Sequence, residues 1–235
     1  MEFQSTLDID GTEKTASERA YRLLREDIVS GALAPGQKLK IDMLRKRYDI
    51  GTGPLREAMS RLAGDHLVTI LGQRGFVVAP FTAQDAREIG DLRKMVEAEA
   101  LKLSFPEGDV EWEEKVITTF HRLERLEADP GKSAAALSDW ERLNHAFHEA
   151  LVAACPSVWL LRTRASMFNH HERYRRLSRV RTVLTRDISR EHRALMEAAL
   201  DKDVDAGQQI MREHIERTTQ AVVQAIQASK AEQTG

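Results

Sequence analysis

The sequence predicts a mainly α-helical protein with an N-terminal winged helix-turn-helix and a C-terminal antiparallel all-α helical bundle. Three observations support this prediction. Apolar residues recur at helical spacing along most of the 235-residue chain. The chain has only 13 Gly and 6 Pro, so turns are few and helices are long. The pattern typical of a β-hairpin lies at the end of the first third, around residues 67–78.

The N-terminal part, residues 16–80, is predicted to contain three helices followed by a hairpin. Their apolar faces are Ala20, Leu23, Leu24 and Ile28, then Ile41, Leu44 and Tyr48, then Leu55, Ala58, Met59, Leu62 and Ala63. A turn cluster at residues 31–36 separates the first two helices, and Pro54 is placed at the first position of the third. Residues 67–71 and 76–78 are the predicted hairpin strands. Two helices joined by a tight turn and followed by a hairpin are typical of a winged helix-turn-helix.

The remainder, residues 81–228, is predicted to form six helices and to serve effector binding and dimerisation. Ile89, Leu92, Val96, Ala100 and Leu103 form a bundle seam on the first helix. The other helices are predicted around residues 116–123, 133–154, 158–179, 188–200 and 204–226, with breaks near Pro106, Pro130 and Pro156. Residues 1–15 are predicted to be a disordered tail, and residues 229–235 a second tail.

Composition excludes several classes of protein. No apolar run approaches the roughly 18 residues of a membrane span, and the N-terminus lacks a signal-peptide pattern. A single cysteine, Cys155, excludes an internal disulfide, so we expect a cytoplasmic protein. Residues 14–80 carry 12 basic and 7 acidic side chains, a net charge of +5, whereas residues 81–235 carry 23 and 26, a net charge of −3. This asymmetry favours a nucleic-acid-binding module joined to an acidic partner domain.

The third predicted helix is the candidate for insertion into the DNA major groove. Its start offers backbone N–H groups to a phosphate, and Gly53 allows a close approach. Arg56 is placed on the outer face near this end, where an arginine can bind guanine in a bidentate manner. The candidate contacts on the helix are Thr52, Gly53, Arg56 and Arg61, and those at the hairpin tip are Gln73 and Arg74. The alternative is that Arg56 and Arg74 are ordinary solvated surface residues.

Three histidines are predicted to point into the bundle from three different helices. His148 shares an inward stripe with Asn144, while His192 and His214 lie on the apolar faces of the last two helices. Three imidazoles and one oxygen ligand fit Zn²⁺ or another divalent transition ion. The alternative is that these are buried histidines hydrogen-bonded to carboxylates. The other histidines considered, His121, His145, His170 and His171, lie off these stripes and are predicted to be surface or rim residues.

The N-terminal motifs resemble those of GntR-type transcriptional regulators. The resemblance rests on three segments in order, which are Gly31-x-Leu33-x-Pro35-Gly36-x-x-Leu39, Pro54-Leu55-Arg56-Glu57-Ala58 and Gly75-Phe76-Val77-Val78. Thr52 and Asp42 stand where members of the family often carry arginine. Both replacements remove a cation from the DNA-binding face, so the operator need not be the usual one of the family.

The helical remainder resembles the FCD effector domain of the FadR/VanR branch, in which an Asp and three His hold a metal. The matching positions are Asn144, His148, His192 and His214, so an amide replaces the usual carboxylate. The resemblance implies Zn²⁺ first, with Ni²⁺ or another ion as alternatives. Arg93, with Glu97, matches a conserved pair of the family and is the candidate for binding an effector carboxylate. The alternative for Arg93 is a plain ion pair with Glu97. Several local features are similar to glutarate-responsive, carbon-starvation repressors of this branch.

These predictions together describe a homodimeric, ligand-responsive repressor that binds an inverted-repeat DNA operator and is modulated by a small organic carboxylate. Two alternatives belong to other classes. A metal-dependent hydrolase would use the three histidines to activate water, but no carboxylate base is expected on the inward stripes. A constitutive architectural DNA-binding dimer would need no buried polar cluster. Neither alternative accounts for both the winged helix and the histidines.

Overall fold

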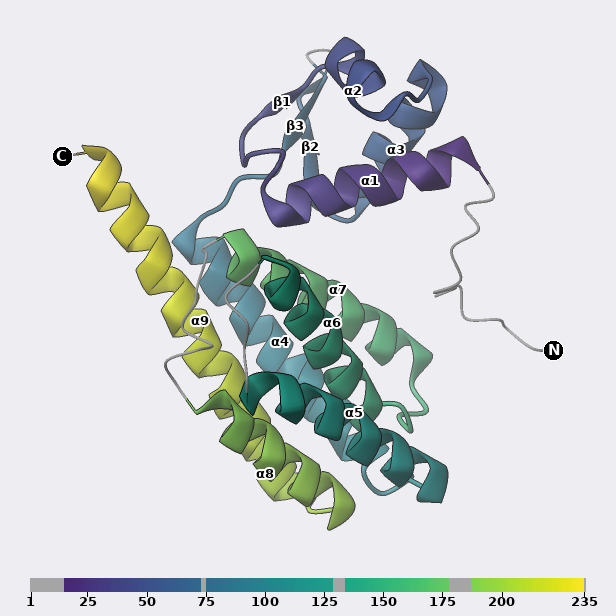
Figure 1. The fold of residues 1–235 in the computed structure, drawn as a ribbon, viewed down its shortest axis with the longest axis vertical. Helices are drawn as coiled ribbons and strands as arrows, with labels where there is room; N and C mark the ends of the chain where they lie inside the picture. The colour runs from purple at the N-terminus through teal and green to yellow at the C-terminus, as the bar shows by residue number, and fades with distance from the viewer. Residues whose placement is uncertain (1–14, 73–74, 129–133, 178–186, 235) are drawn as a thin grey trace. The chain divides into compact units, whose positions relative to one another are not determined.

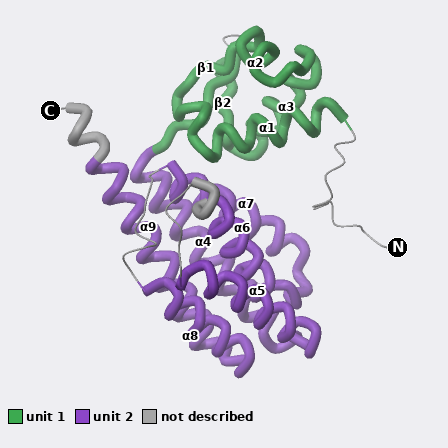
Figure 2. Tube along the Cα trace, viewed as in Figure 1, with its two compact units in different colours: residues 1–81 green, residues 82–235 purple. Residues whose placement is uncertain are grey.

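The computed structural model describes residues 15–72, 75–128, 134–177 and 187–234. The chain divides into two compact units, residues 1–81 and 82–235, and each is described by itself (Figure 2). Helices make up most of both units within the described residues, which confirms the mainly α fold class. Gln73 and Arg74, two candidate DNA contacts, lie outside the described residues, as do residues 1–14 of the predicted tail 1–15.

The first unit combines three helices with a small antiparallel sheet (Figure 1). Its elements are α1 (Ala16–Ser30), β1 (Lys38–Leu39), α2 (Ile41–Tyr48), α3 (Thr52–Gly64), β2 (Val68–Ile70) and β3 (Phe76–Val78). The strands lie in the order β1-β3-β2, so β3 pairs with both neighbours. The hairpin of the sequence analysis is β2 and β3. Strand β1 was not predicted, because a two-residue strand has no periodicity to detect.

Local signals in the sequence define both ends of α1. The Thr15 hydroxyl accepts a hydrogen bond from the backbone N–H of Glu18, and the Glu18 carboxylate accepts one from the N–H of Thr15, both at 3.1 Å. The helix ends at Gly31, whose φ of 83° is left-handed and therefore suits glycine. Between these caps, Leu24 and Ile28 are fully buried and α1 packs against α3.

Helix α3 begins two residues earlier than predicted. Gly51 is its N-cap, and Pro54 is the third helical residue rather than the first. The first intrahelical bond runs from the N–H of Leu55 to the carbonyl of Gly51. Pro54 therefore replaces an N–H that would have no partner within the helix, so it does not interrupt the hydrogen-bond ladder.

The second unit is a bundle of helices, with no strand among its described residues. The helices are α4 (Ala83–Ser104), α5 (Val110–Ala128), α6 (Ala134–Leu151), α7 (Val158–Leu177), α8 (Ile188–Leu200) and α9 (Val204–Thr234). Helix α4 packs mainly against α9 and α7, and α5 packs against α6 and α8. The sequence analysis ended the last helix near residue 226 and placed a tail at 229–235. The structure instead continues α9 to Thr234, because nothing in this alanine- and glutamine-rich segment stops a helix.

Helices α4 and α9 approach each other closely at Gly90. A Cβ atom at this position would lie 2.4 Å from the Thr219 hydroxyl oxygen, which is far inside contact distance. Only glycine therefore allows the two helices to meet here without displacement of Thr219. The contact lies one turn before Arg93 on α4 and in the middle of α9.

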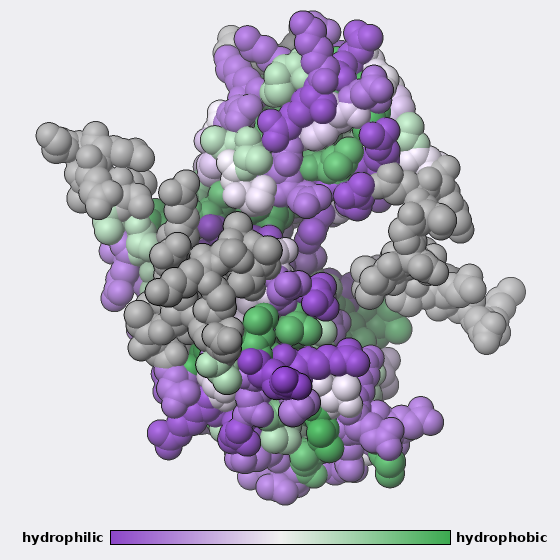
Figure 3. Space-filling view, viewed as in Figure 1, coloured by the Kyte–Doolittle hydropathy of each residue, from purple (hydrophilic) through white to green (hydrophobic). Residues whose placement is uncertain are grey.

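No helix among the described residues has the length and apolar character needed to span a bilayer. The space-filling view shows hydrophilic side chains over much of the visible face, with apolar side chains between them (Figure 3). Exposed apolar residues are present, Trp159 at 75% and Met95 at 68% among them. Scattered apolar residues of this kind are usual on folded proteins.

Candidate functional site

The start of α3 presents its polar residues to solvent. Leu55 and Met59 are fully buried, whereas Thr52, Gly53 and Arg56 are exposed. Arg56 makes no hydrogen bond or ion pair with any residue that the structure describes. Its guanidinium is therefore available at the end of the helix from which recognition helices contact base edges.

Arg61, the other candidate on α3, is already engaged within the unit. Its guanidinium carbon lies 4.4 Å from the centroid of the Tyr21 ring. The Tyr21 hydroxyl donates a hydrogen bond to Asp65 at 2.7 Å. Burial, followed by this carboxylate, raises the pKa of Tyr21 to about 12. DNA binding by Arg61 would require it to leave this stacked arrangement.

The three predicted histidines converge in the interior of the second unit. His148 comes from α6, His192 from α8 and His214 from α9, and they are 0%, 0% and 5% exposed. Each histidine offers one ring nitrogen, and these three nitrogen atoms all lie within 4.8 Å of one another. The ring centroids are 5.1–5.6 Å apart. Such close approach of three imidazoles is the arrangement that a shared cation requires.

Carboxylates orient two of these imidazoles. The Nδ1 atom of His192 lies 2.9 Å from Glu127, and the Nδ1 atom of His214 lies 2.9 Å from Glu191. An Nδ1–H that donates to a carboxylate leaves Nε2 as the lone-pair nitrogen, as in metal-bound histidines. The Nε2 atom of His192 is buried and has no partner among the described residues. The sequence analysis looked for carboxylates only on the inward stripes of the histidine helices, whereas Glu127 reaches the cluster from α5, a helix not considered for this site.

His148 and Asn144 supply further unpaired acceptors in the same interior. Both ring nitrogens of His148 and the amide oxygen of Asn144 are buried without a hydrogen-bond partner among the described residues. Burial, followed by the nearby charges of His214 and Arg93, holds the pKa of His148 well below its ordinary value, so the ring is neutral. Buried acceptors without partners are costly and rare. Nitrogen and amide-oxygen donors in this number fit a divalent transition ion.

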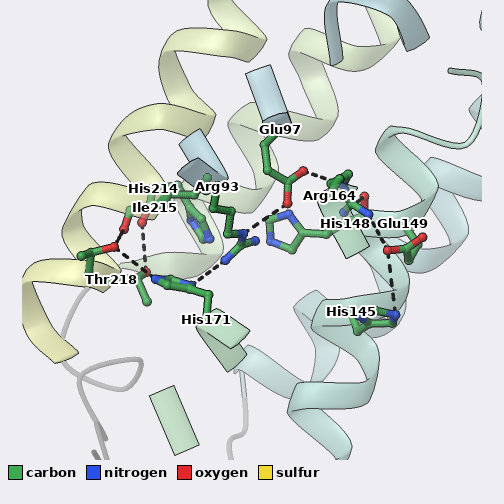
Figure 4. Close-up of polar contacts among 11 residues, drawn as sticks. Arg93, Glu97, His145, His148, Glu149, Arg164, His171, His214, Ile215 and Thr218 are labelled. Carbon is green, nitrogen blue, oxygen red and sulfur yellow. Dashed lines mark hydrogen bonds and ion pairs between the residues drawn. The ribbon is translucent and has the colours of Figure 1, made fainter. Parts of the chain in front are cut away.

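Arg93 lies beside this cluster, almost fully buried, at 1% exposure. Its Nε donates to Glu97 at 3.2 Å, and its Nη1 lies 2.7 Å from Nδ1 of His171 (Figure 4). Its Nη2 has no partner among the described residues. Burial lowers the pKa of Arg93 to about 10, with further lowering from Arg175 and Arg164 and partial compensation from Glu97. The bonds to Glu97 and His171 therefore leave the Nη2 amino group of the guanidinium available.

Sequence reasoning missed Arg164, which completes the charge network. It donates to the second oxygen of Glu97 at 2.7 Å, to Glu149 at 2.5 Å and to the backbone carbonyl of His148 at 3.0 Å. Glu97 thus lies between two buried arginines (Figure 4). A second buried pair joins Arg175 to Glu141.

Two of the four histidines predicted to lie at the surface or rim are buried. His170 is 8% and His171 is 1% exposed. Helix α7 contacts α4 and α9, and its buried stripe of Arg164, Phe168, His171 and Arg175 is mostly polar. A hydrophobic-periodicity argument cannot detect a polar buried face. The available signal was the spacing of these residues by four, three and four positions, which places them on one face of α7.

These features define a class of protein. A family model described as bacterial regulatory proteins of the gntR family matches residues 16–78, and the FCD domain model matches residues 88–217. The chain belongs to the GntR family and is a transcriptional regulator with a C-terminal FCD effector domain. The family indicates DNA binding, a small-molecule effector and a regulator rather than an enzyme. FCD domains commonly bind metal.

Individual relatives cover most of the chain. The uncharacterised regulator BphR of Paraburkholderia xenovorans is 39% identical over 88% of this chain and 85% of its own length. The transcriptional repressor GlaR of Escherichia coli is 38% identical over 83% and 90%. A GntR family regulator from Pseudomonas syringae, at 29% identity, aligns over 93% and 89% with a TM-score of 0.56. E. coli McbR/YncC, at 15% identity and a TM-score of 0.74 over 89% and 98%, shares the fold.

Proposed function

We propose that this protein is a ligand-responsive repressor whose operator binding is modulated by a small organic carboxylate held beside a metal ion in the helical unit. The observation that carries the proposal is that atoms suited to bind a cation and a group suited to bind an anion are buried close together in the helical unit. Buried histidine nitrogens and the Asn144 amide oxygen, which have no partner among the described residues, can bind a cation, and the unpaired Nη2 of Arg93 can donate to an anion. A metal ion with a carboxylate ligand would satisfy both.

The metal would be held by His148, His192, His214 and the amide oxygen of Asn144. Zn²⁺ is the first candidate, because three imidazoles and one oxygen suit its coordination, and Ni²⁺ is an alternative. When bound, the ion supplies a positive centre that can bind an anionic oxygen. Glu127 and Glu191 hold two of the imidazoles in the required orientation. Asn144, being neutral, leaves one more positive charge at the centre than an aspartate would.

The effector would be a carboxylate that reaches Arg93. Arg93 shares the buried carboxylate of Glu97 with Arg164, which also pairs with Glu149, and the Nη2 of Arg93 has no partner among the described residues, so Arg93 can donate to a further anion. A dicarboxylate such as glutarate can place one carboxylate at the metal and the other at Arg93. The centroid of the Phe168 ring lies 4.4 Å from the central carbon of the Arg93 guanidinium, so the ring covers one face of that group.

DNA would be bound by a homodimer on an inverted repeat, with the start of α3 in the major groove. A two-fold dimer matches the symmetry of such an operator. Helix α4, which carries Arg93, follows the winged unit directly in the chain. A carboxylate that binds one placement of α4 better than another would therefore change operator affinity. This function places the protein in the cytoplasm.

Elemental analysis tests the metal. Purified protein, stripped by a chelator and reloaded with Zn²⁺, should hold the ion, and His148→Ala should not, because two imidazoles and an amide are too few ligands. His121→Ala, at an exposed histidine on α5, is the matched control. Absence of metal from the wild-type protein under every loading condition would contradict the proposed centre.

Thermal shift measurements test the carboxylate. Glutarate should raise the melting temperature of the Zn²⁺-loaded protein by mass action. Arg93→Lys keeps the charge without the fork and should lose most of this shift, whereas Arg87→Ala, at an exposed arginine on the same helix, should keep it. Stabilisation by neutral sugars or amines but by no carboxylate would overturn this part of the proposal.

A further inference from the structure

We propose that His171 and Thr219 are positioning residues that orient the Arg93 guanidinium for the effector. The inference rests on the proposed function for the identity of the ligand. It adds two residues, on α7 and α9, that touch neither the metal nor the carboxylate in this scheme. They act by fixing the direction of the unpaired Nη2 amino group of Arg93.

A continuous series of buried hydrogen bonds connects the three residues, and Figure 4 shows its first bond, between Arg93 and His171. Nη1 of Arg93 lies 2.7 Å from Nδ1 of His171, and Nε2 of His171 lies 3.1 Å from the hydroxyl of Thr219. That hydroxyl donates to the carbonyl of Ile215 at 2.9 Å. The side chains of Arg93, His171 and Thr219 belong to residues that are 1%, 1% and 5% exposed. The series therefore runs from the effector arginine to the backbone of α9.

The donors in this series determine the protonation of His171. A guanidinium only donates, so Nδ1 of His171 must accept. The single hydroxyl proton of Thr219 is directed to the carbonyl of Ile215, so the Thr219 oxygen must accept from Nε2–H. His171 is thus a neutral imidazole with its proton on Nε2. The hydroxyl of Thr219 selects this tautomer, and the tautomer presents a lone pair to Arg93.

Close packing holds the hydroxyl in place. The Gly90–Thr219 contact brings α4 against this side chain. Arg93 follows Gly90 by three residues, so the same turn of α4 carries the contact and the arginine. On α9, Thr219 follows the metal-ligand candidate His214 by five residues. The pair of helices α4 and α9 therefore positions both the His214 imidazole and the Arg93 guanidinium.

The expected consequence is a selective loss of affinity. Without the Thr219 oxygen as acceptor for Nε2–H, the His171 ring loses the hydrogen bond that fixes it, so the lone pair that it presents to Nη1 is held less firmly and the guanidinium loses part of its fixed direction. A dicarboxylate that uses both the metal and Arg93 should bind less tightly. A monocarboxylate that uses only the metal should not be affected.

Calorimetry on the Zn²⁺-loaded full-length chain tests this, with glutarate and butyrate as probes. Thr219→Val keeps the shape and removes the acceptor, and it should weaken glutarate binding about tenfold, the usual scale of one buried hydrogen bond. Thr219→Ser restores the hydroxyl and should restore the affinity. Thr119→Val is the matched control, because the Thr119 hydroxyl also bonds carbonyls of its own helix, α5, but does not belong to the series. Butyrate affinity and zinc content should be unchanged in all of them.

Three outcomes would overturn the inference. Thr219→Val could bind glutarate as the wild type does, it could lose butyrate and zinc in equal measure, or Thr219→Ser could fail to recover. Failure of the wild type to bind any carboxylate overturns the proposed function instead. In that case nitrogen NMR of the His171 imidazole still tests the positioning role, because this measurement needs no ligand. His171 should show a bare Nδ1 and a protonated Nε2 at neutral pH, and the opposite tautomer or a doubly protonated ring contradicts it.

Discussion

The two units are built around different interiors. In the winged unit, the buried side chains form an apolar cluster that includes Leu24, Leu55 and Met59. In the helical unit, an apolar cluster is also present, but buried arginines, histidines and carboxylates lie beside it. All of the buried Arg, Glu, His, Asn, Ser and Thr side chains among the described residues belong to the helical unit. The winged unit thus has an apolar interior and exposed polar residues at the start of α3, whereas the helical unit holds polar and charged side chains in its interior.

The largest effect that tests this contrast should come from Glu97→Ala. Removal of this carboxylate leaves Arg93 and Arg164 buried with reduced compensation, which should cost about 3–5 kcal/mol of the stability of the helical unit. Hydrogen exchange of the full chain should show the loss in α4, α7 and α9. An unchanged exchange pattern in these helices would show that the network does not stabilise the fold. Exposed Glu88 on α4 provides the control substitution, Glu88→Ala.

An ordinary cavity effect is expected in the winged unit. Leu62 is fully buried, and Leu62→Ala should cost about 3 kcal/mol through lost burial and a residual cavity. The same hydrogen-exchange measurement should place this loss in α1 and α3. Zinc content and glutarate affinity should remain those of the wild type. Loss of either would mean that the two interiors are not independent.

Arg56→Ala tests the outer surface of the winged unit. Because Arg56 is exposed and unpaired, its removal should leave stability unchanged and weaken operator binding by about 1–3 kcal/mol if it contacts a base. Fluorescence anisotropy with operator and random DNA measures both quantities. An equal loss on both DNAs would assign Arg56 to a phosphate, and no loss on either would exclude α3 as the recognition helix. Arg22→Ala, at an exposed arginine of α1, is the control.

Tyrosines provide the smallest effect, a dependence of stability on pH that appears only in alkaline solution. Burial and a neighbouring aspartate raise the pKa of Tyr21 in the winged unit and of Tyr174 in the helical unit to about 12, and they also raise the pKa of Tyr48. The stabilising contribution is complete below pH 10, where the phenol is protonated in both states, and it is lost as pH rises through the folded pKa. Absorbance titration should show no phenolate near pH 10 in native protein. Urea-unfolded protein, the control, should titrate there.

The difference between the interiors also explains what the sequence could predict. Apolar periodicity located α1, α3 and α8 because their buried faces are hydrocarbon. It also placed His148, His192 and His214 correctly on inward stripes, since apolar neighbours flank each of them. It failed for His171 and Arg164, because the buried face of α7 is charged. It also failed for Glu127, whose position depends on how α5 packs and not on its own spacing.

The arrangement of Glu97 between Arg93 and Arg164 has a consequence for how such proteins diverge. A change at any one of the three positions breaks a buried ion pair of the network, so the three are coupled and their effects are not additive. A change of specificity that begins at one of these three positions therefore passes through a variant with a less stable helical unit. Asn144 is free of this constraint, because its buried oxygen contacts no partner among the described residues. If the proposed metal centre and carboxylate effector are correct, a change of charge at Asn144 alters the centre without breaking a buried ion pair, and is therefore the accessible route to a response to a different acid.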